Sequence, residues 1–533
     1  MDALRTSAEA VAVRAGRIVA VGPRAEVERL RGPRTRQIEL AGRTLLPGFQ
    51  DAHVHPAMAG VGLTRCPLHD LAPDAGLYLE AIGAYAAAHP ELPWVIGDGW
   101  YMSAFPGGTP TRQALDRVVP DRPAFFVNRD GHGAWVNSRA LALAGIDRTT
   151  TDPISGRIER EPGGDPSGTL HEGALDIVRR ILPPTAIEDR AAGLELAQAY
   201  LHRFGITAWQ DAWVEAEDLA AYRLVAERGT LTGRAIACHW WDRELGAEQI
   251  DDFVERRRTG TIGRLRSTTV KIMADGVAEN FTAAMLEPYL DRAGRSTGNR
   301  GLSFVDPELL KGHVTRLDRL GFQVHLHALG DRAVHEALDA IAAARAANGP
   351  SDGRHHLAHL QVVDPADYPR FRELGVGANI QPYWACSDAQ MTELTLPFLP
   401  ADRRDRQYPF RSLQAAGARL VGGSDWSVST PNVMAEVEVA VNRVSPDRRD
   451  ALPFQPAQAL DLLTALAAFT NGSAWANHLD RETGSIEPGK LADLVVLDRD
   501  IGRVDLRTIG DTRVLLTLVE GVPVHEDPEL ELA

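Results

Sequence analysis

Pro47-Gly48-Phe49-Gln50-Asp51-Ala52-His53-Val54-His55-Pro56 is the stretch that decides the fold, and it ends an apolar run that begins at Leu45. If the run is a strand, its period of two puts the imidazoles of His53 and His55 on one face. Two neighbouring imidazoles at a strand end are half of a metal site. The pair alone is weak evidence, since two packed or surface histidines fit the same pattern. The rest of the site must come from later strand ends.

The composition is typical of a soluble globular protein, with 533 residues, 44% hydrophobic and 24% charged. The formal charge of −15 argues against nucleic acid or an anionic membrane as a partner. No apolar stretch approaches the roughly 20 residues that span a bilayer, and the N-terminus lacks the pattern of a secretory signal. The three cysteines, Cys66, Cys238 and Cys386, are widely spaced and odd in number, which favours reduced thiols. We therefore expect a cytoplasmic protein.

Seven further apolar runs follow the first, and helical patterns separate several of them. They cover residues 204–213, 233–241, 268–276, 322–331, 355–363, 376–384 and 419–428. Alternating strands and helices predict a parallel sheet, and eight strands are the number that a closed barrel needs. The fold class is therefore α/β, a (β/α)8 TIM-like barrel.

Two regions lie outside this alternation. Short strand patterns at both ends, within residues 1–48 and 476–533, predict a composite β-sandwich domain that encloses a barrel of residues 49–475. Residues 60–203 separate the first two barrel strands, far more than the usual loop of about 2–6 residues. We expect an inserted subdomain beside the barrel mouth.

Barrel enzymes carry their chemistry at the C-terminal ends of the strands. After the histidine pair, those ends supply Lys271, His327, His359 and Asp425. Imidazole and carboxylate suit a divalent ion such as Zn²⁺, with Mn, Fe, Co or Ni as alternatives.

The strand-end motifs resemble the amidohydrolase superfamily, and more narrowly its YtcJ-like branch (amidohydrolase family 3), which includes N-substituted formamide deformylases. The similarity extends over nearly the whole chain. It is carried by PGFQDAHVHP, KIMADG, HLHALGD, LAHLQVVDP and GGSDWSVSTP, by DGHGAWVNSRAL and GTLHEGA in the insert, and by GSIEPGKLADLVVLD.

The resemblance implies one or two divalent metal ions, with Zn²⁺ expected. His53 and His55 would hold the more buried ion, while His327 and His359 would hold the second. Lys271 would be carboxylated by CO₂ and bridge the two ions, and Asp425 would touch the first ion and handle the proton. Burial near cations favours the neutral lysine that CO₂ can modify.

Several of these residues have alternative interpretations. A lysine such as Lys271 is more often an ion-paired or snorkelling residue. His325 shares a strand face with His327, and we expect it to support the site from behind. We interpret His355 and His356 as structural, and Asp331 as the cap of the following helix.

The insert adds candidates for catalysis and substrate binding. His132 lies in a glycine-flanked polar turn, and we expect it to be catalytic together with Asp425. We expect substrate contacts from Asn137 and Glu172, and from indoles near the mouth, namely Trp100, Trp213 and Trp384. This many indoles favour a substrate with an apolar or aromatic part.

Together these features predict a metal-dependent hydrolase that cleaves the non-peptide C–N bond of a small amide, an N-formyl or N-acyl amine, by attack of a metal-bound hydroxide. Alternatives are hydrolysis of a lactam, carbamate or ester, deamination with one metal, and a non-enzymatic binding or regulatory protein. The exact substrate and the oligomeric state, with a homodimer as one option, stay open.

Overall fold

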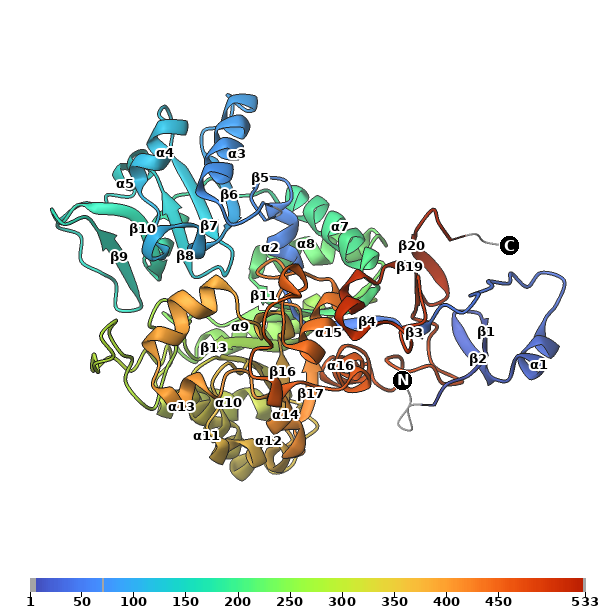
Figure 1. Ribbon diagram of the computed structural model, residues 1–533. Helices are drawn as coiled ribbons and strands as arrows, with labels where there is room; N and C mark the ends of the chain where they lie inside the picture. The colour runs from blue at the N-terminus through green and yellow to red at the C-terminus, as the bar shows by residue number, and fades with distance from the viewer. Residues whose placement is uncertain (1–5, 70, 531–533) are drawn as a thin grey trace.

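The computed structural model describes residues 6–69 and 71–530. A parallel sheet of eight strands lies at its centre, and Figure 1 shows how the other elements surround it. The strand order is β17-β16-β15-β14-β13-β12-β11-β4, so each strand lies beside its neighbour in the sequence. The strands are β4 (Phe49–Val54), β11 (Ile206–Val214), β12 (Arg234–Trp240), β13 (Leu265–Met273), β14 (Gln323–Ala328), β15 (His356–His359), β16 (Gly377–Ile380) and β17 (Arg419–Gly422). The predicted (β/α)8 barrel is confirmed.

The first apolar run divides between two sheets. Residues Leu45–Pro47 form β3, which pairs with the C-terminal strand β18 (Leu494–Leu497), and β4 begins at Phe49 in the barrel. Gly48 joins them in close contact with Thr207, where a Cβ atom would lie 2.5 Å from Cγ2. A side chain does not fit there, so glycine is required where the chain passes from one sheet to the other.

The last barrel strand is shorter than its apolar run because the chain turns toward β4. β17 ends at Gly422, and the following loop closes the barrel through backbone hydrogen bonds. The Asp425 N–H donates to the His53 carbonyl at 2.7 Å, and the His55 N–H donates to the Trp426 carbonyl at 2.7 Å. These bonds place Asp425 directly beside His53 and His55, at the end of the first strand.

Helices surround the barrel in the expected alternation. They are α2 (Pro56–Gly62), α7 (Ile187–Arg203), α8 (Ala216–Glu227), α9 (Gln249–Gly260), α10 (Pro307–Arg319), α11 (Asp331–Asn348), α12 (Tyr368–Leu374), α13 (Ala401–Arg404), α14 (Phe410–Ala415), α15 (Val433–Asn442), α16 (Leu462–Ala467) and α17 (Ser473–Ala476). Helix α7 packs against α2, and a Cβ atom on Gly60 would lie only 2.3 Å from the Gly193 carbonyl oxygen.

The region between the first two barrel strands contains a separate six-stranded sheet, at the upper left of Figure 1. Its order is β5-β6-β7-β8-β10-β9, from Cys66–Pro67, Val95–Trp100, Ala124–Asn128, Gly133–Val136, Pro166–Glu172 and Gly156–Arg160. Its helices are α3 (Ala75–Ala88), α4 (Arg112–Val118), α5 (Ser138–Leu143) and α6 (Leu175–Arg179). The Arg129 guanidinium fastens this sheet to the barrel, because it donates to the carbonyls of Val428 and Ser429, both at 2.9 Å.

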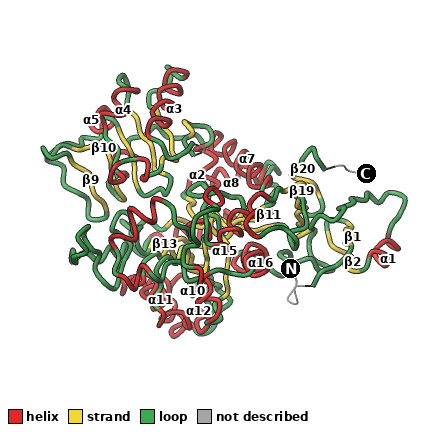
Figure 2. Tube along the Cα trace, in the orientation of Figure 1, coloured by secondary structure: helices red, strands yellow, loops and turns green. Residues whose placement is uncertain are grey.

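Strands from both ends of the chain lie side by side beyond the barrel (Figure 2). A four-stranded sheet has the order β20-β19-β18-β3, with β19 at Val514–Val519 and β20 at Val522–Glu526. The hairpin of β1 (Ala10–Arg14) and β2 (Arg17–Gly22) precedes α1 (Arg24–Val27) and bonds to the C-terminal segment through the Ile18 N–H and the Lys490 carbonyl. Within the described residues, no helix is both long and apolar enough to cross a bilayer.

Candidate metal centre

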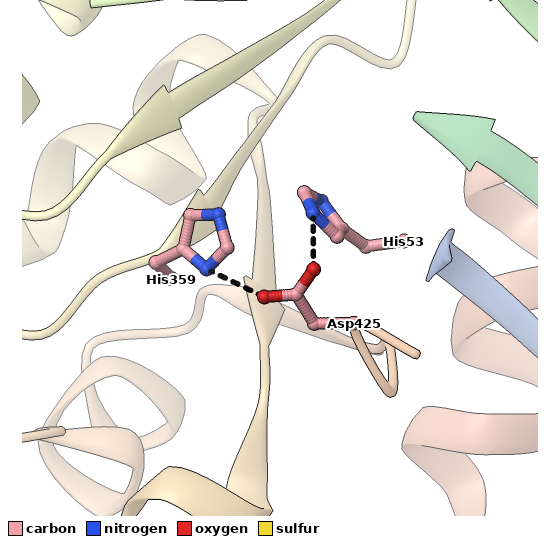
Figure 3. Close-up of side chains that lie close together, drawn as sticks. All are labelled: His53, His359 and Asp425. Atoms are coloured by element: carbon pink, nitrogen blue, oxygen red, sulfur yellow. Dashed lines mark ion pairs between the residues drawn. The ribbon is translucent and has the colours of Figure 1, made fainter. Parts of the chain in front are cut away.

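Three side chains from distant parts of the sequence meet at the C-terminal end of the barrel (Figure 3). The Asp425 carboxylate lies between two imidazoles, with Oδ1 at 3.3 Å from His53 Nε2 and Oδ2 at 3.8 Å from His359 Nδ1. Ligand atoms of all three residues lie within 4.8 Å of one another. Two nitrogens and one oxygen at this spacing are the donor set of a divalent transition metal.

The other predicted ligands line the same cavity. His55 Nε2 lies 3.0 Å from Asp425 Oδ1, so His53 and His55 reach the same carboxylate oxygen. The His327 ring centroid lies 4.4 Å from that of His359. Lys271 is 2% exposed, and its strand register aligns it with Trp240 and His325.

Burial and mutual charge set the protonation of this cluster. Burial, reinforced by Lys271 and neighbouring imidazoles, lowers the pKa of His53 well below its ordinary value, and burial does the same for His327 and His359. Burial also lowers the pKa of Lys271 to about 8. For Asp425 burial acts in the opposite direction, but the His55 hydrogen bond and nearby charges outweigh it and hold the pKa below its ordinary value.

The residues present fit a metal ion on two observations. His55 Nδ1 is buried without a hydrogen-bond partner among the described residues. The ligand atoms are imidazole nitrogens and carboxylate oxygens, which suit a borderline ion such as Zn²⁺. Any ion here would be held by His53, His359 and Asp425, with His55, Lys271 and His327 beside them.

Buried amides and carboxylates hold the ligands from behind. Asp51 Oδ1 accepts from the backbone N–H groups of His53 and Ser424, both at 3.0 Å, and thereby connects the first and last barrel strands. Gln381 Oε1 accepts from the His359 N–H at 2.7 Å. Gln381 was not identified from the sequence, where a lone glutamine in an apolar run carries no pattern that assigns its direction.

His132 enters the site from the insert. Its Nδ1 lies 3.0 Å from Glu172 Oε2, and its ring centroid lies 5.6 Å from that of His327. Glu172 Oε1 accepts from the Thr282 hydroxyl at 2.8 Å, so this carboxylate joins the insert to the loop after β13. Burial would lower the pKa of His132, but the charge of Glu172 outweighs it and raises the pKa to about 9.

A cavity of about 760 Å³ extends outward from these residues between the barrel and the insert. Trp213 and Trp240 form one wall, stacked with ring centroids 3.9 Å apart and an interplanar angle of 3°. Trp384, Trp241 and Phe304 add further aromatic lining. A volume of this size suits a small organic molecule with an apolar part.

Three residues lie away from the positions expected for them. Among the described residues, the cavity lining does not include Trp100 or Asn137. Trp100 is buried in the core of the insert and donates to the Phe126 carbonyl, while Asn137 caps α5 through the Ala140 N–H. Asp331 is the first residue of α11 without capping it, and it accepts instead from the Leu286 N–H and from Arg403. The expectations for these three are corrected accordingly.

A parallel eight-stranded barrel whose strand ends gather imidazoles, a buried lysine and a carboxylate defines the class of metal-dependent barrel hydrolases. The chain belongs to the amidohydrolase family, whose family model matches residues 36–525. The family expected from the strand-end motifs is thus confirmed.

The chain is also similar to individual proteins and to a solved structure. The chain is 28% identical to an N-substituted formamide deformylase of Arthrobacter pascens, with 99% of this chain and 96% of that protein covered. It is 30% identical to the protein LONG AFTER FAR-RED 3 of Arabidopsis thaliana, with 92% and 84% covered. A crystal structure of an uncharacterized metal-dependent hydrolase from Pyrococcus horikoshii OT3 superposes with a TM-score of 0.71 at 24% identity, covering 93% of this chain and 94% of that one. This last similarity supports the fold.

Proposed function

We propose that this protein hydrolyses the C–N bond of a small amide, an N-formyl or N-acyl amine. One observation carries the proposal: Asp425 lies among three imidazoles on the floor of a cavity, and stacked indoles form one wall of that cavity. The similarity to an N-substituted formamide deformylase supports the choice of a formamide over other amides.

One or two divalent ions, bound by the histidines, Asp425 and a carboxylated Lys271, would supply a water of lowered pKa and polarise the amide carbonyl. Asp425 is ionised at neutral pH, since its pKa lies below the ordinary value. It is therefore ready to accept the proton of an attacking water. The same carboxyl group can then return that proton to the nitrogen of the departing amine.

His132 is the second acid–base candidate. Its Nδ1 is held by Glu172, which leaves Nε2 to face other partners in the cavity. With a pKa of about 9 the imidazole is protonated at neutral pH and can donate to a substrate oxygen. We assign the wall formed by Trp213 and Trp240, together with Trp384, to the substituent on the amide nitrogen.

The proposal is tested by assaying the purified protein, supplied with Zn²⁺, Mn²⁺ or Co²⁺, against a matched substrate panel. The panel contains formamides with alkyl or aromatic groups on nitrogen, the corresponding acetamides, a lactam, a carbamate, an ester and an aminated heterocycle. Turnover of the formamides with release of formate is the expected result. Preferential turnover of the ring amine or the ester by the metal-loaded protein would contradict the proposal.

A further inference from the structure

Gln210 lies inside the barrel, beneath the candidate metal centre, in the middle of β11. It is fully buried, and its Oε1 lies 2.8 Å from His325 Nδ1 and 2.9 Å from His356 Nε2. His325 Nε2 in turn lies 2.8 Å from His53 Nδ1. A continuous hydrogen-bonded path therefore runs from Gln210 through His325 to a candidate ligand.

Two backbone carbonyls determine which groups donate and which accept along this path. Gln323 Nε2 donates to the carbonyls of Arg354 and Ala476, both at 2.8 Å, which uses both of its protons and defines its amide orientation. Gln323 Oε1 must then accept, and it does so from Gln210 Nε2 at 3.0 Å. The Gln210 amide is thereby oriented with Oε1 toward the two imidazoles.

The contacts of Asn379 and His356 independently give the same orientation of the Gln210 amide. Asn379 Nδ2 donates to the Ala52 carbonyl at 2.9 Å and lies 3.1 Å from His356 Nδ1, so that ring nitrogen is an acceptor. Burial lowers the pKa of His356 to about 3, so the ring is neutral and its one proton is on Nε2. That proton points at Gln210 Oε1, in agreement with the first anchor.

We propose that Gln210 is a positioning residue that sets the tautomer of His53 through His325. Because Gln210 Oε1 accepts from His325 Nδ1–H, the Nε2 atom of His325 carries a lone pair and accepts from His53 Nδ1–H. His53 Nε2 is then unprotonated. Its lone pair points into the cavity toward Asp425 Oδ1, 3.3 Å away.

Two electron-rich atoms at that distance repel each other unless a cation lies near both. The network therefore leaves His53 Nε2 with a lone pair that can bind a metal ion. Without a proton, this atom cannot donate a hydrogen bond to Asp425. Partners that fix the tautomer of a ligating histidine commonly change metal affinity by 10–100-fold. The inference rests on the proposed function only in taking His53 as a metal ligand, and it is independent of the substrate.

The test measures zinc affinity by competition with a chromophoric chelator in the metal-free protein and three variants. Gln210→Met keeps the length of the side chain but removes the acceptor, and we expect zinc affinity to fall about 10–100-fold. Gln210→Glu should bind zinc almost as the parent does. A buried, protonated carboxyl reproduces the pattern, since its carbonyl accepts from both imidazoles and its O–H donates to Gln323.

Thr269→Val is the matched control, since it removes a hydrogen bond to the same Gln323 Oε1, of 2.9 Å, without touching the path to His53. It should lose stability without losing zinc affinity.

Two results would overturn the inference. One is a zinc affinity of Gln210→Met equal to that of the parent. The other is a loss of zinc affinity in Gln210→Glu or in Thr269→Val as large as the loss in Gln210→Met. Should Gln210→Met fail to fold, Gln210→Glu decides alone, with retained affinity in support and a loss against. Absent formamide turnover alongside the expected zinc affinities would refute the proposed function and leave this inference standing.

Discussion

His132 and Glu172 form a buried ion pair in which Nδ1 lies 3.0 Å from Oε2. Glu172 adopts a left-handed backbone conformation, with φ of 52°, at the end of β10. A residue other than glycine adopts this conformation only when its surroundings hold it there. The surrounding structure thus holds the His132–Glu172 pair in place where the insert meets the barrel.

The pH dependence of stability should reveal this pair. The pKa of His132 is raised from 6.5 to about 9, so its contribution is fully present below pH 6.5 and is lost as the pH rises through about 9. The pKa of Glu172 is lowered from 4.5, since His132 outweighs burial, so its contribution is fully present above pH 4.5 and is lost as the pH falls through the lowered native pKa. Glu172→Gln should therefore cost most stability between these two ordinary values and progressively less toward pH 9. Denaturant unfolding of the parent and of Glu172→Gln across this pH range measures the difference in their free energies of unfolding. Glu161→Gln is the control, because it breaks an ion pair with Arg112 and leaves the His132–Glu172 pair intact, so it should not show this change toward pH 9.

Asp425→Asn tests the proton transfer. The amide keeps the shape and one oxygen for the metal, but it cannot accept and return a proton. We expect kcat to fall by about 10²–10⁴, the usual range for an acid–base group, with metal content largely retained. Steady-state kinetics with metal analysis on the same samples checks this. Turnover near that of the parent in the metal-loaded variant would show that Asp425 only holds the loop.

Carboxylation of Lys271 should be visible directly. Burial lowers the pKa of this amine to about 8, so a larger neutral fraction is available to CO₂ than for an ordinary lysine. Protein loaded with zinc and ¹³C-bicarbonate should give a carbamate carbon resonance that disappears in Lys271→Met. The absence of that resonance in the loaded parent would leave a single ion on His53, His359 and Asp425 as the simplest centre.

The indole wall should decide which formamides are preferred. Trp213→Ala removes one member of the stack with Trp240, and aromatic pairs contribute about 0.5–1.5 kcal/mol beyond their buried area. We expect KM to rise up to about tenfold for formamides with an aromatic nitrogen substituent, with little change in kcat. N-methylformamide is the internal control, since its nitrogen carries only a methyl group and no aromatic ring. Equal effects on both substrates would mean that the stack supports the fold only.

Much of the architecture could be predicted because strand ends in a barrel converge whatever their separation in sequence. His53, His359 and Asp425 follow apolar runs, so their meeting required only the barrel topology. No comparable rule predicts where the side chains of the insert point. Its sheet has its own register and core, so whether Trp100 faced the mouth or the interior depended on packing that its sequence does not specify.

Gln210 is a second residue whose role could not be predicted from the sequence. A glutamine within an apolar run gives no sign of direction, and its partners His325, His356 and Gln323 come from other strands. Only closure of the barrel brings these side chains together. The hydrogen-bonding consequences for His53 follow from that closure and from two backbone carbonyls that the sequence cannot place.

One of those carbonyls belongs to Ala476, and the neighbouring Asn477 side chain bonds to Gln50 in the first barrel strand at 3.2 Å. On the ribosome, His53 and His55 emerge long before Ala476 and Asn477, which complete their surroundings. Loop closure over so long a stretch is slow compared with local folding. The hydrogen-bonded surroundings of His53 can therefore be complete only after Ala476 and Asn477 have been synthesised.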